Sequence, residues 1–478
     1  MTATIASLGT GPALYPPTVP GATGRLPLPK LLWRLVRNPL TSLPQSVYEE
    51  GIVVQYSGRL VAAWVTDPGL IEKVLLHQAD RFPKTPVQMR LLAHLGDGIL
   101  NAEGASWRWQ RRTAAPLFRP ADLVSLVLAM AAQAEAQLER WAQSGADRVQ
   151  AVDRDMSVTT FRVLSATMFA GSVDTEAAQI LRSIDTMVST ASWTIAMALI
   201  RFPAWFWHPG KHRRQQAARQ LRETAAAILA RRRAEGLKGD DLLARLARAQ
   251  DPDTAAPMSD RQLIDNLLTF LGAGHETTAR ALSWTLYLLA RAPEWQSRVR
   301  EEVLSVAGRG PVGAEHLDKL TTTRAVLEEA MRLYPTFPII PRQAAAPIEL
   351  GGKTIPAGAN VTIPVFAVHR HRRLWDDPDR FDPERFLPGR REKIARTQFM
   401  PFGFGPRICI GAAFAMMEGV TILATLVRAA GFSWDGRHLP EPVSRTSLRP
   451  KGGMPLRVRV LDAQRQAEAA LPAPAARR

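Results

Sequence analysis

Apolar positions along the chain repeat mainly with the period of an α-helix, from about residue 66 to residue 333. The longest such pattern predicts a helix from about Ser259 to Ala292. Ser259 and Gln262 form a capping-box pair at its start, and Pro293 ends it. At 1.5 Å per residue this helix would be about 50 Å long, enough to cross a whole domain.

Alternating strand patterns are short and confined to a few regions. Two pairs of short runs flank turn residues, Ser57-Gly58 and Gly351-Gly352, and therefore predict hairpins. The predicted strands are Ile52–Tyr56 with Leu60–Val65, Ile348–Leu350 with Lys353–Ile355, and Leu456–Val460 near the end of the chain. The fold class that follows is mainly α with a minor β portion, α+β.

The chain reads as one large domain with two irregular ends. Its length of 478 residues would suggest about three domains, but no repeat or change of composition supports a division. Residues 1–28 are rich in Gly, Pro, Thr and Ala and predict a flexible arm. Residues 463–478 are rich in Ala, Pro and Arg and predict a disordered tail. The folded domain is expected to span residues 29–462.

Nothing in the sequence resembles a targeting or membrane segment. No run of eighteen apolar residues occurs, so we expect no membrane span. The first residues lack the basic start and apolar core of a signal peptide. A single cysteine in the whole chain is typical of a reducing compartment. We therefore expect a cytoplasmic protein.

The net charge of +17 and the pI of about 10.8 raise the question of a nucleic-acid binder. The arginines are spread over the chain, and no nucleic-acid-binding signature is present. We therefore predict no nucleic-acid partner and interpret the charge as a basic face that attracts an acidic protein.

The only cysteine, Cys409, lies in a glycine-rich loop that leads into a helix from Ala412. A single thiol excludes an internal disulfide and a multi-cysteine metal site, and leaves either an inert buried thiol or one thiolate bound to a ligand. The helix N-terminus would stabilise a thiolate. The glycines would let a flat ligand approach, and Arg407 could meet an anionic group on it.

From Phe402 to Gly411 the loop reads Phe-x-x-Gly-x-Arg-x-Cys-x-Gly and resembles the cytochrome P450 family. The resemblance extends from about Leu28 to Leu461. It implies the cytochrome P450 fold, with a long central helix over haem b, and Cys409 as the thiolate ligand of the haem iron. Phe402, Arg407 and Gly411 would then contact the cofactor.

The middle of the long helix carries Leu271-Gly272-Ala273-Gly274-His275-Glu276-Thr277-Thr278. Each interior glycine costs about 1 kcal/mol relative to alanine and permits a local kink. This segment resembles the family's haem-facing helix. The resemblance implies that Ala273 contacts the haem, that Thr277 hydrogen-bonds dioxygen and that Glu276 supplies protons through water. The alternative is a packing site with a back-bonding threonine.

Several charged residues gain meaning only from the resemblance. Glu329 and Arg332 are one turn apart, as on many helix surfaces, but the family would bury them with Arg385 as a network that secures the cysteine loop. Trp107-x-x-x-Arg111 and Arg342 match residues that reach the haem propionates. His369-Arg370 matches the family's His-Arg, but His371-Arg372 stands where Asp-Pro is usual, and we expect a solvated basic turn from His369 to Arg373.

The predicted activity is a monooxygenase reaction on a small lipophilic molecule, such as a fatty acid or a terpenoid. Phe337, Ile339 and Leu271 are the expected substrate-pocket residues. Dioxygen activation needs two electrons, and no flavin or nicotinamide fold is present, so we expect a ferredoxin or flavodoxin with its reductase to bind a monomer near Arg112 and Arg119. The alternative is a peroxide-driven peroxygenase. Aromatic residues at 203–207 could touch a membrane surface weakly.

Overall fold

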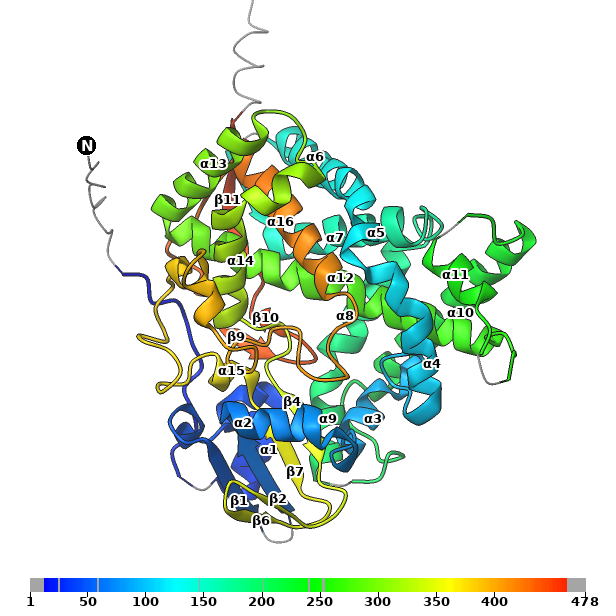
Figure 1. Cartoon of the computed structure of the whole chain (residues 1–478), viewed down its shortest axis with the longest axis vertical. Helices are drawn as coiled ribbons and strands as arrows, with labels where there is room; N and C mark the ends of the chain where they lie inside the picture. Colours follow the sequence, from blue (N-terminus) through cyan, green and yellow to red (C-terminus); the bar gives the residue numbers. More distant parts are fainter. Residues whose placement is uncertain are drawn as a thin grey trace, which may run out of the picture.

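The computed structural model describes residues 13–24, 26–57, 60–145, 147–200, 202–239, 241–251 and 254–461. Helices form most of this part of the chain, and a smaller region of strands lies at one end of it (Figure 1). The predicted class, mainly α with a minor β portion, is confirmed. The predicted tail at 463–478 lies outside the described residues.

The helical part consists of long helices that pack on one another. The α-helices are α1 (Leu28–Arg37), α2 (Pro68–Glu72), α3 (Pro86–Leu92), α4 (Gly104–Ala114), α5 (Pro120–Leu123), α6 (Val127–Ser144), α7 (Val152–Met168), α8 (Ala177–Ser189), α9 (Ala191–Leu199), α10 (Lys211–Ala234), α11 (Leu242–Arg248), α12 (Asp260–Arg291), α13 (Pro293–Ala307), α14 (Thr321–Leu333), α15 (Val365–Val368) and α16 (Ala412–Ala429).

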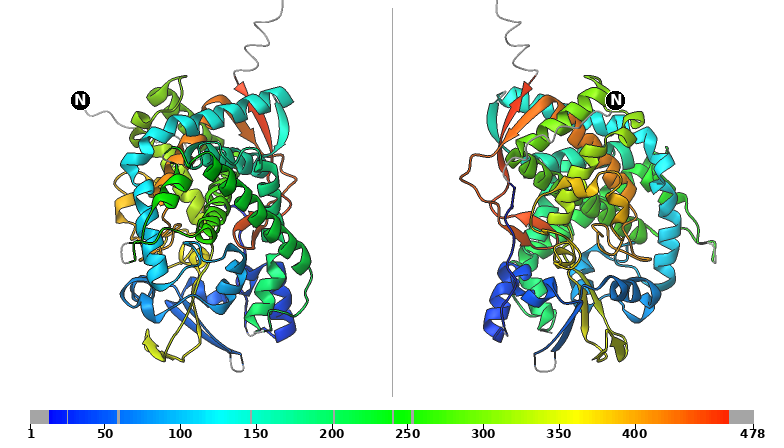
Figure 2. Two further views of the ribbon diagram at one scale, coloured as in Figure 1. Left: turned by 90° about the vertical axis from the view of Figure 1, so that its right-hand side faces the viewer. Right: turned by 60° about the vertical axis from the view of Figure 1, so that its left-hand side comes forward.

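The strands form small separate sheets. They are β1 (Ile52–Ser57), β2 (Leu60–Val65), β3 (Asp147–Ala151), β4 (Ile340–Gln343), β5 (Ile348–Leu350), β6 (Lys353–Ile355), β7 (Asn360–Ile363), β8 (Ala430–Ser433), β9 (Pro442–Ser444), β10 (Leu448–Pro450) and β11 (Pro455–Val460). The largest sheet has the order β1-β2-β7-β4, and another has the order β3-β11-β8. Figure 2 shows these two sheets at opposite ends of the molecule. Both predicted hairpins and the C-terminal strand are confirmed.

The long predicted helix is α12, which crosses the middle of the helical part (Figure 1). The Ser259 hydroxyl accepts a hydrogen bond from the Gln262 N–H at 3.3 Å, and the Gln262 side chain accepts one from the Ser259 N–H at 3.0 Å, so the capping box is present. Pro293 ends α12 and is also the first residue of α13. Most of α12 is buried because α7, α10, α14 and α16 pack around it.

Residues 13–24 do not form the flexible arm predicted for residues 1–28. The N–H of Phe381 donates to the carbonyl of Leu14 at 2.9 Å, and the Tyr334 hydroxyl donates to the carbonyl of Pro17 at 2.8 Å. Val19 is buried in the main core. The prediction is wrong for this segment because the glycines and prolines that suggested disorder also suit an extended strand-like path with long-range partners. Residues 1–12 lie outside the described residues.

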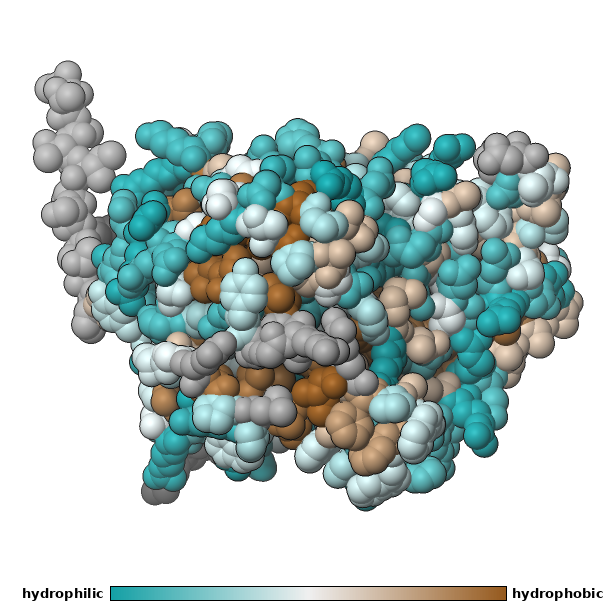
Figure 3. Space-filling view, turned by 90° about the horizontal axis from the view of Figure 1, so that it is seen from below, coloured by the Kyte–Doolittle hydropathy of each residue, from teal (hydrophilic) through white to brown (hydrophobic). Residues whose placement is uncertain are grey.

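By length and composition one described helix, α16, could cross a membrane, and a bent pair over residues 104–144 would be a second candidate. Two thirds of α16 is buried, and α16 packs against α6, α12 and α13, as a core helix does. At the end of the molecule seen in Figure 3, apolar surface lies between hydrophilic regions. Trp205 is 78% exposed and Trp207 is 63% exposed. Weak contact of these two side chains with a membrane stays a prediction.

Candidate active site

The cysteine loop is held in place by its own backbone and by a close neighbour. The Cys409 N–H donates to the carbonyl of Phe402 at 2.9 Å, and the Ile408 N–H donates to the carbonyl of Gly405 at 3.0 Å. Gly405 has a φ of 77°, and a side chain there would collide with the carbonyl oxygen of Leu75. Only glycine therefore fits this turn, which directs Cys409 toward the start of α16.

Cys409 is accessible to solvent although protein atoms surround it. Burial among these atoms raises the pKa of its thiol, while the Gly411 backbone and the Arg111 guanidinium oppose that shift. Accessibility and desolvation occur together when a residue faces an enclosed space.

The middle of α12 also faces open space. Ala273 is exposed although its helix is mostly buried, and a side chain at Gly272 would meet nothing within 4 Å. The Thr277 hydroxyl lies one turn further and donates to the carbonyl of Ala273 at 3.0 Å. The two glycines differ in purpose, because a side chain at Gly274 would lie 2.9 Å from Leu164 of α7. Gly274 therefore allows the close contact of α7 with α12.

Two bridges connect this part of α12 with the cysteine loop. Phe118 stacks on Phe270 of α12 with ring centroids 5.9 Å apart, and its ring would lie 3.8 Å from a side chain at Gly411. On the other side, the Thr336 hydroxyl donates to the carbonyl of Thr277 at 3.3 Å, and four residues later Ile340 lies 3.9 Å from the Cβ position of Gly403. We therefore infer that the accessible parts of the loop and of α12 face one shared space, which is called the hollow below.

A group of cations lies at the cysteine-loop side of this hollow. Arg111 donates to the carbonyl of Ile408 at 2.8 Å. Arg407 donates to the carbonyl of Ala102 at 2.9 Å, and its guanidinium lies 3.9 Å above the Trp107 ring. Arg342, on β4, is half-buried, and burial next to Arg407 lowers its pKa to about 10. The structure therefore brings the predicted Arg111, Arg342, Arg407 and Trp107 together around the cysteine loop.

Sequence analysis missed two residues of this group, Lys84 and Glu103. Lys84 pairs with Glu103 at 2.9 Å, and Glu103 also accepts from Arg407 at 2.6 Å. Burial lowers the pKa of Lys84, and Arg407 and Arg342 lower it further. Among the described residues Glu103 is the anion paired with these cations, so positive charge exceeds negative charge there. Neither residue lies in a motif, so no sequence pattern pointed to them.

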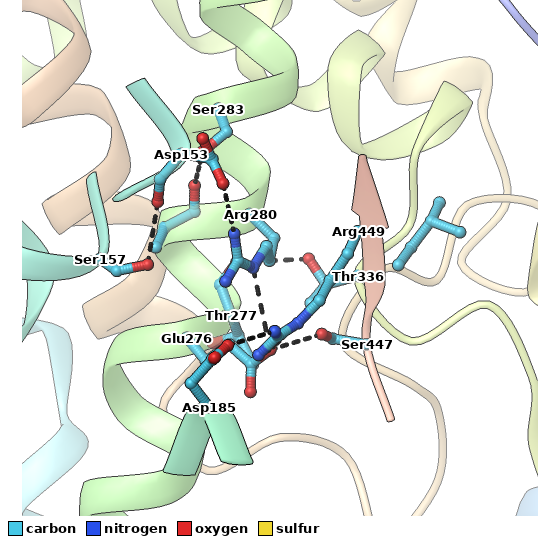
Figure 4. Close-up of polar contacts among 12 residues, drawn as sticks. Asp153, Ser157, Asp185, Glu276, Thr277, Arg280, Ser283, Thr336, Ser447 and Arg449 are labelled. Carbon is cyan, nitrogen blue, oxygen red and sulfur yellow. Dashed lines mark hydrogen bonds and ion pairs between the residues drawn. The ribbon is translucent and has the colours of Figure 1, made fainter. Parts of the chain in front are cut away.

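Glu276 turns away from the hollow into a chain of ions (Figure 4). Its Oε1 accepts from the Ser447 hydroxyl at 2.7 Å and from Arg449 Nη2 at 2.6 Å. Arg449 of β10 also donates to Asp185 of α8 at 2.7 Å, while Arg280 lies 3.8 Å from Glu276. Burial raises the pKa of Glu276, but the two arginines and Ser447 outweigh it and hold the pKa below its usual value.

This arrangement gives Glu276 a structural role, and its predicted role in passing protons through water stays a prediction. A buried carboxylate with a lowered pKa and three donors on one oxygen stays ionised at neutral pH, so it holds no proton at rest. Adjacent residues of a helix point about 100° apart, so Thr277 faces the hollow while Glu276 faces β10. Glu276 ties α12 to β10 and, through Arg449, to α8.

Glu329, Arg332 and Arg385 form the buried ion network that the sequence predicted. Glu329 and Arg332 are fully buried on α14 and pair at 2.6 Å, and Arg385 Nε lies 3.8 Å from Glu329. Arg332 also donates to backbone carbonyls of the segment after α15: those of His369 at 2.8 Å, Pro378 at 2.7 Å and Arg380 at 3.0 Å. One guanidinium therefore fixes a long irregular segment.

The solvated basic turn expected from His369 to Arg373 is wrong for its first three residues, which are buried. His369 Nε2 accepts from the Met400 N–H at 3.0 Å, which requires the proton on Nδ1, and Nδ1 lies 3.2 Å from the carbonyl of Arg332. Burial, with Arg332 beside it, lowers the pKa of His369 to about 3, so the ring is neutral. His369 thus links the ion network to the segment that enters the cysteine loop.

The expected pocket residues divide into two groups. Phe337 is 47% exposed and Ile339 is half-buried, and both lie on the segment that bridges α12 and the cysteine loop. Leu271 is fully buried in the main core, so its assignment to the pocket is wrong. The physical reason is its position: Leu271 lies two residues from Ala273, about 200° around the helix, and therefore on the opposite face.

Comparisons with known proteins agree with this site. The family model described as Cytochrome P450 matches residues 28–455. Cyclooctat-9-en-7-ol 5-monooxygenase of Streptomyces melanosporofaciens is 33% identical, over 86% of this chain and 88% of that protein. Cytokinin hydroxylase of Arabidopsis thaliana is 32% identical, over 86% and 81%. The crystal structure of the cytochrome P450DA haem domain superposes with a TM-score of 0.74 and 26% identity, over 86% and 90%.

These matches define a haem-dependent monooxygenase with the cytochrome P450 fold. The chain belongs to the cytochrome P450 family. Its own residues fit the cofactor, since an accessible thiol faces small residues of α12 across a hollow and cations exceed anions at the rim. Haem carries two propionates, and partly buried arginines are suited to bind them.

Proposed function

We propose that this chain is a haem-thiolate monooxygenase that inserts one oxygen atom of dioxygen into a terpenoid-like lipophile, with electrons from separate carrier proteins. The observation that carries the proposal is the single hollow shared by the accessible Cys409 thiol and by Ala273 and Thr277 of α12. The cofactor is proposed to be haem b, held by Cys409 and bounded by Phe402 and Gly411. Arg111, Arg342, Arg407 and Trp107 would hold its propionate side.

When bound, the haem supplies dioxygen activation, and the protein contributes position and proton control. Cys409 would hold the haem iron as a thiolate, and the charge of the iron would offset the burial that raises the pKa of the thiol in the free protein. The Thr277 hydroxyl now donates to the Ala273 carbonyl at 3.0 Å. By rotating about χ1 it can donate to dioxygen in the hollow and hold it in place until protons arrive.

A terpenoid-like substrate is supported by the lining and by the relatives. Phe337 and Ile339 present apolar surface beside Thr277. Several relatives carry names of such compounds, including cyclooctat-9-en-7-ol 5-monooxygenase and cyclooctatin synthase of Streptomyces melanosporofaciens, and 11-oxo-beta-amyrin 30-oxidase of Glycyrrhiza uralensis. A fatty acid is the second substrate class that an apolar lining accepts.

The test is a product screen by mass spectrometry with surrogate ferredoxin and reductase, in wild type and Thr277→Ala. Wild type should form a product one oxygen atom heavier than its substrate, with that atom from labelled dioxygen. Thr277→Ala should still bind substrate, because the cofactor ligand is unchanged. It should release several times more hydrogen peroxide per reductant consumed, because dioxygen loses the hydrogen bond that the Thr277 hydroxyl would donate. Losing such a hydrogen bond costs about 1–3 kcal/mol.

Ser283→Ala is the matched control, because Ser283 is a buried hydroxyl on the same helix that donates to the carbonyl of Ala279 at 2.6 Å. It should release as much hydrogen peroxide per reductant consumed as wild type does. Product that forms only with added peroxide, and not with dioxygen and electrons, would instead identify a peroxygenase. Wild-type coupling in Thr277→Ala would assign dioxygen positioning to another group.

We also propose that the electron carrier, a ferredoxin or flavodoxin with its reductase, binds over the cysteine loop. Arg108, Arg112 and Arg119 are exposed on and beside α4, and the neighbouring Arg111 bonds the loop itself. Ile408, next to Cys409, is 39% exposed and would lie within this contact. A basic rim around an apolar centre suits an acidic partner of a chain with net charge +17.

Reduction by such a carrier should slow about tenfold as ionic strength rises from 0.05 to 0.5 M, because exposed charges are screened over about 10 Å at 0.1 M. Arg112→Glu should slow reduction at low salt without changing substrate affinity, as measured by stopped-flow. Arg219→Glu, the same charge change at an exposed site on α10, should leave the rate unchanged. Equal slowing by both variants would mean that only net charge matters.

A further inference from the structure

Glu418 is a buried carboxyl group with no partner. It lies on α16, nine residues after Cys409, and is fully buried. Within the described part of the chain neither of its carboxyl oxygens has a hydrogen-bond partner. Buried carboxyl oxygens are almost always satisfied by protein or by ordered water. Two unsatisfied oxygens on one side chain therefore need an explanation.

Two hydroxyl groups share this condition and face the same place. Thr278, on α12, is buried and lies close enough to the Glu418 carboxyl to lower its pKa, although the geometry falls short of a hydrogen bond. Thr421 is one turn from Glu418 on the same face of α16 and is fully buried. The hydroxyls of both threonines also lack partners among the described residues. The three side chains thus gather unsatisfied oxygens between α12 and α16, which pack on each other.

The place of this cluster connects it with the hollow. Thr278 directly follows Thr277, whose hydroxyl faces the hollow, so the cluster lies just behind the wall that Thr277 forms. A buried water needs two to four polar partners, and these side chains supply them. At rest Glu276 itself holds no proton, because its arginine clamp keeps it ionised.

We propose that Glu418 is a proton-holding residue of this enzyme: with Thr278 and Thr421 it binds buried water and passes a proton along that water to the Thr277 side of the hollow. The O–H bond of the Glu418 carboxyl breaks as a new O–H bond forms on the water, which gives one of its own protons onward. The carboxylate then regains a proton from solvent water. Glu418 acts through water and is therefore a positioning residue.

The electrostatics of the site agree with this role. Burial raises the pKa of Glu418 to about 8, and the Thr278 hydroxyl opposes the shift. The carboxyl is therefore protonated at neutral pH, as a proton donor must be. Glu276 and Glu418 thus have opposite protonation states on two sides of the same part of α12, because arginines clamp Glu276 whereas Glu418 is buried without a charged group that shifts its pKa.

The first test does not depend on turnover. Infrared spectra at pH 7 should show a carboxylic-acid C=O stretch that is lost in Glu418→Gln and shifts in D₂O, and a crystal structure should show ordered water bonded to Glu418 and Thr278. Glu328→Gln is the matched control, because Glu328 on α14 is a buried carboxyl with a raised pKa that instead pairs with Arg391 at 3.2 Å. It should leave the Glu418 band in place. An ionised Glu418, or a dry cluster, would overturn the inference.

The second test rests on the proposed monooxygenase function. Glu418→Gln should release several times more hydrogen peroxide per reductant than wild type. Glu418→Asp should bring this release most of the way back to the wild-type value, and Glu328→Gln should not change it. The melting temperature of Glu418→Gln should not fall, since glutamine fills the same volume. If wild type forms no product, the proposed function fails whatever the infrared result. If wild type forms product and Glu418→Gln couples equally well, only the role of Glu418 fails.

Discussion

Replacing Cys409 with alanine is expected to abolish the red-shifted Soret band of the reduced, carbon-monoxide-bound protein and nearly all monooxygenase turnover. Cys409 is the only thiol in the chain and is accessible in the hollow opposite α12. Thiolate ligation supplies the electron density that favours O–O cleavage. Turnover should fall by at least about a thousandfold, equivalent to about 4 kcal/mol of transition-state stabilisation.

The control for this prediction is Ile408→Ala, which shortens the neighbouring exposed side chain on the same loop and leaves the thiol in place. It should keep the red-shifted band, because the Cys409 N–H bond to Phe402 and the glycine turns are unchanged. Absorbance spectroscopy of the two variants decides the matter. A Cys409→Ala protein that kept the red-shifted band would show that another side chain binds the iron.

Arg332→Leu is expected to cost about 3–5 kcal/mol of folding free energy, the second large effect. The substitution leaves the buried Glu329 carboxylate without its main partner and three backbone carbonyls without a donor. Removing one partner of a buried pair is costly because the other charge stays desolvated. Urea unfolding followed by circular dichroism should show the loss, and haem retention should fall because the segment before the cysteine loop loses its anchor.

Arg298→Leu provides the matched control. Arg298 donates to Glu384 at 2.7 Å, with side chains 44% and 38% exposed. Glu384 belongs to the one-turn helix η9 (Pro383–Phe386), beside the buried network. An exposed pair of this kind is worth less than about 1 kcal/mol, so Arg298→Leu should unfold much like wild type. An equal loss of unfolding free energy in both variants would show that burial is not the reason why the Arg332 network stabilises the fold.

The comparison of Glu276 with Glu418 shows what a motif leaves open. Glu276 lies in the motif beside Thr277, and the resemblance implied that it passes on protons, but its ionised state depends on Ser447 and Arg449, which come from β10 and the turn before it, more than 170 residues away. Glu418 lies in no motif that we recognised. Its protonated state follows from burial where α12 packs against α16. No charged group of the described residues is among the causes that shift its pKa.

The sequence by itself determined the local features of this protein. These local features are the capping box of Ser259, the glycines around Cys409 and the turn residues of the hairpins. Each depends only on residues a few positions away, so each can be predicted from the sequence. The cysteine motif and the spacing of Glu329 and Arg332 were legible for the same reason, once a resemblance gave them meaning.

The tertiary structure decided which of these residues face solvent, the core or the hollow. Leu271 and Ala273 are nearly equivalent in the sequence, yet only Ala273 is exposed, because helix rotation points Leu271 into the core. His369 is neutral, Glu276 ionised and Glu418 protonated because of partners and burial supplied by distant segments. Desolvation and Coulomb interactions depend on distances in space, and distances between residues far apart in the chain are set only when the whole chain is folded.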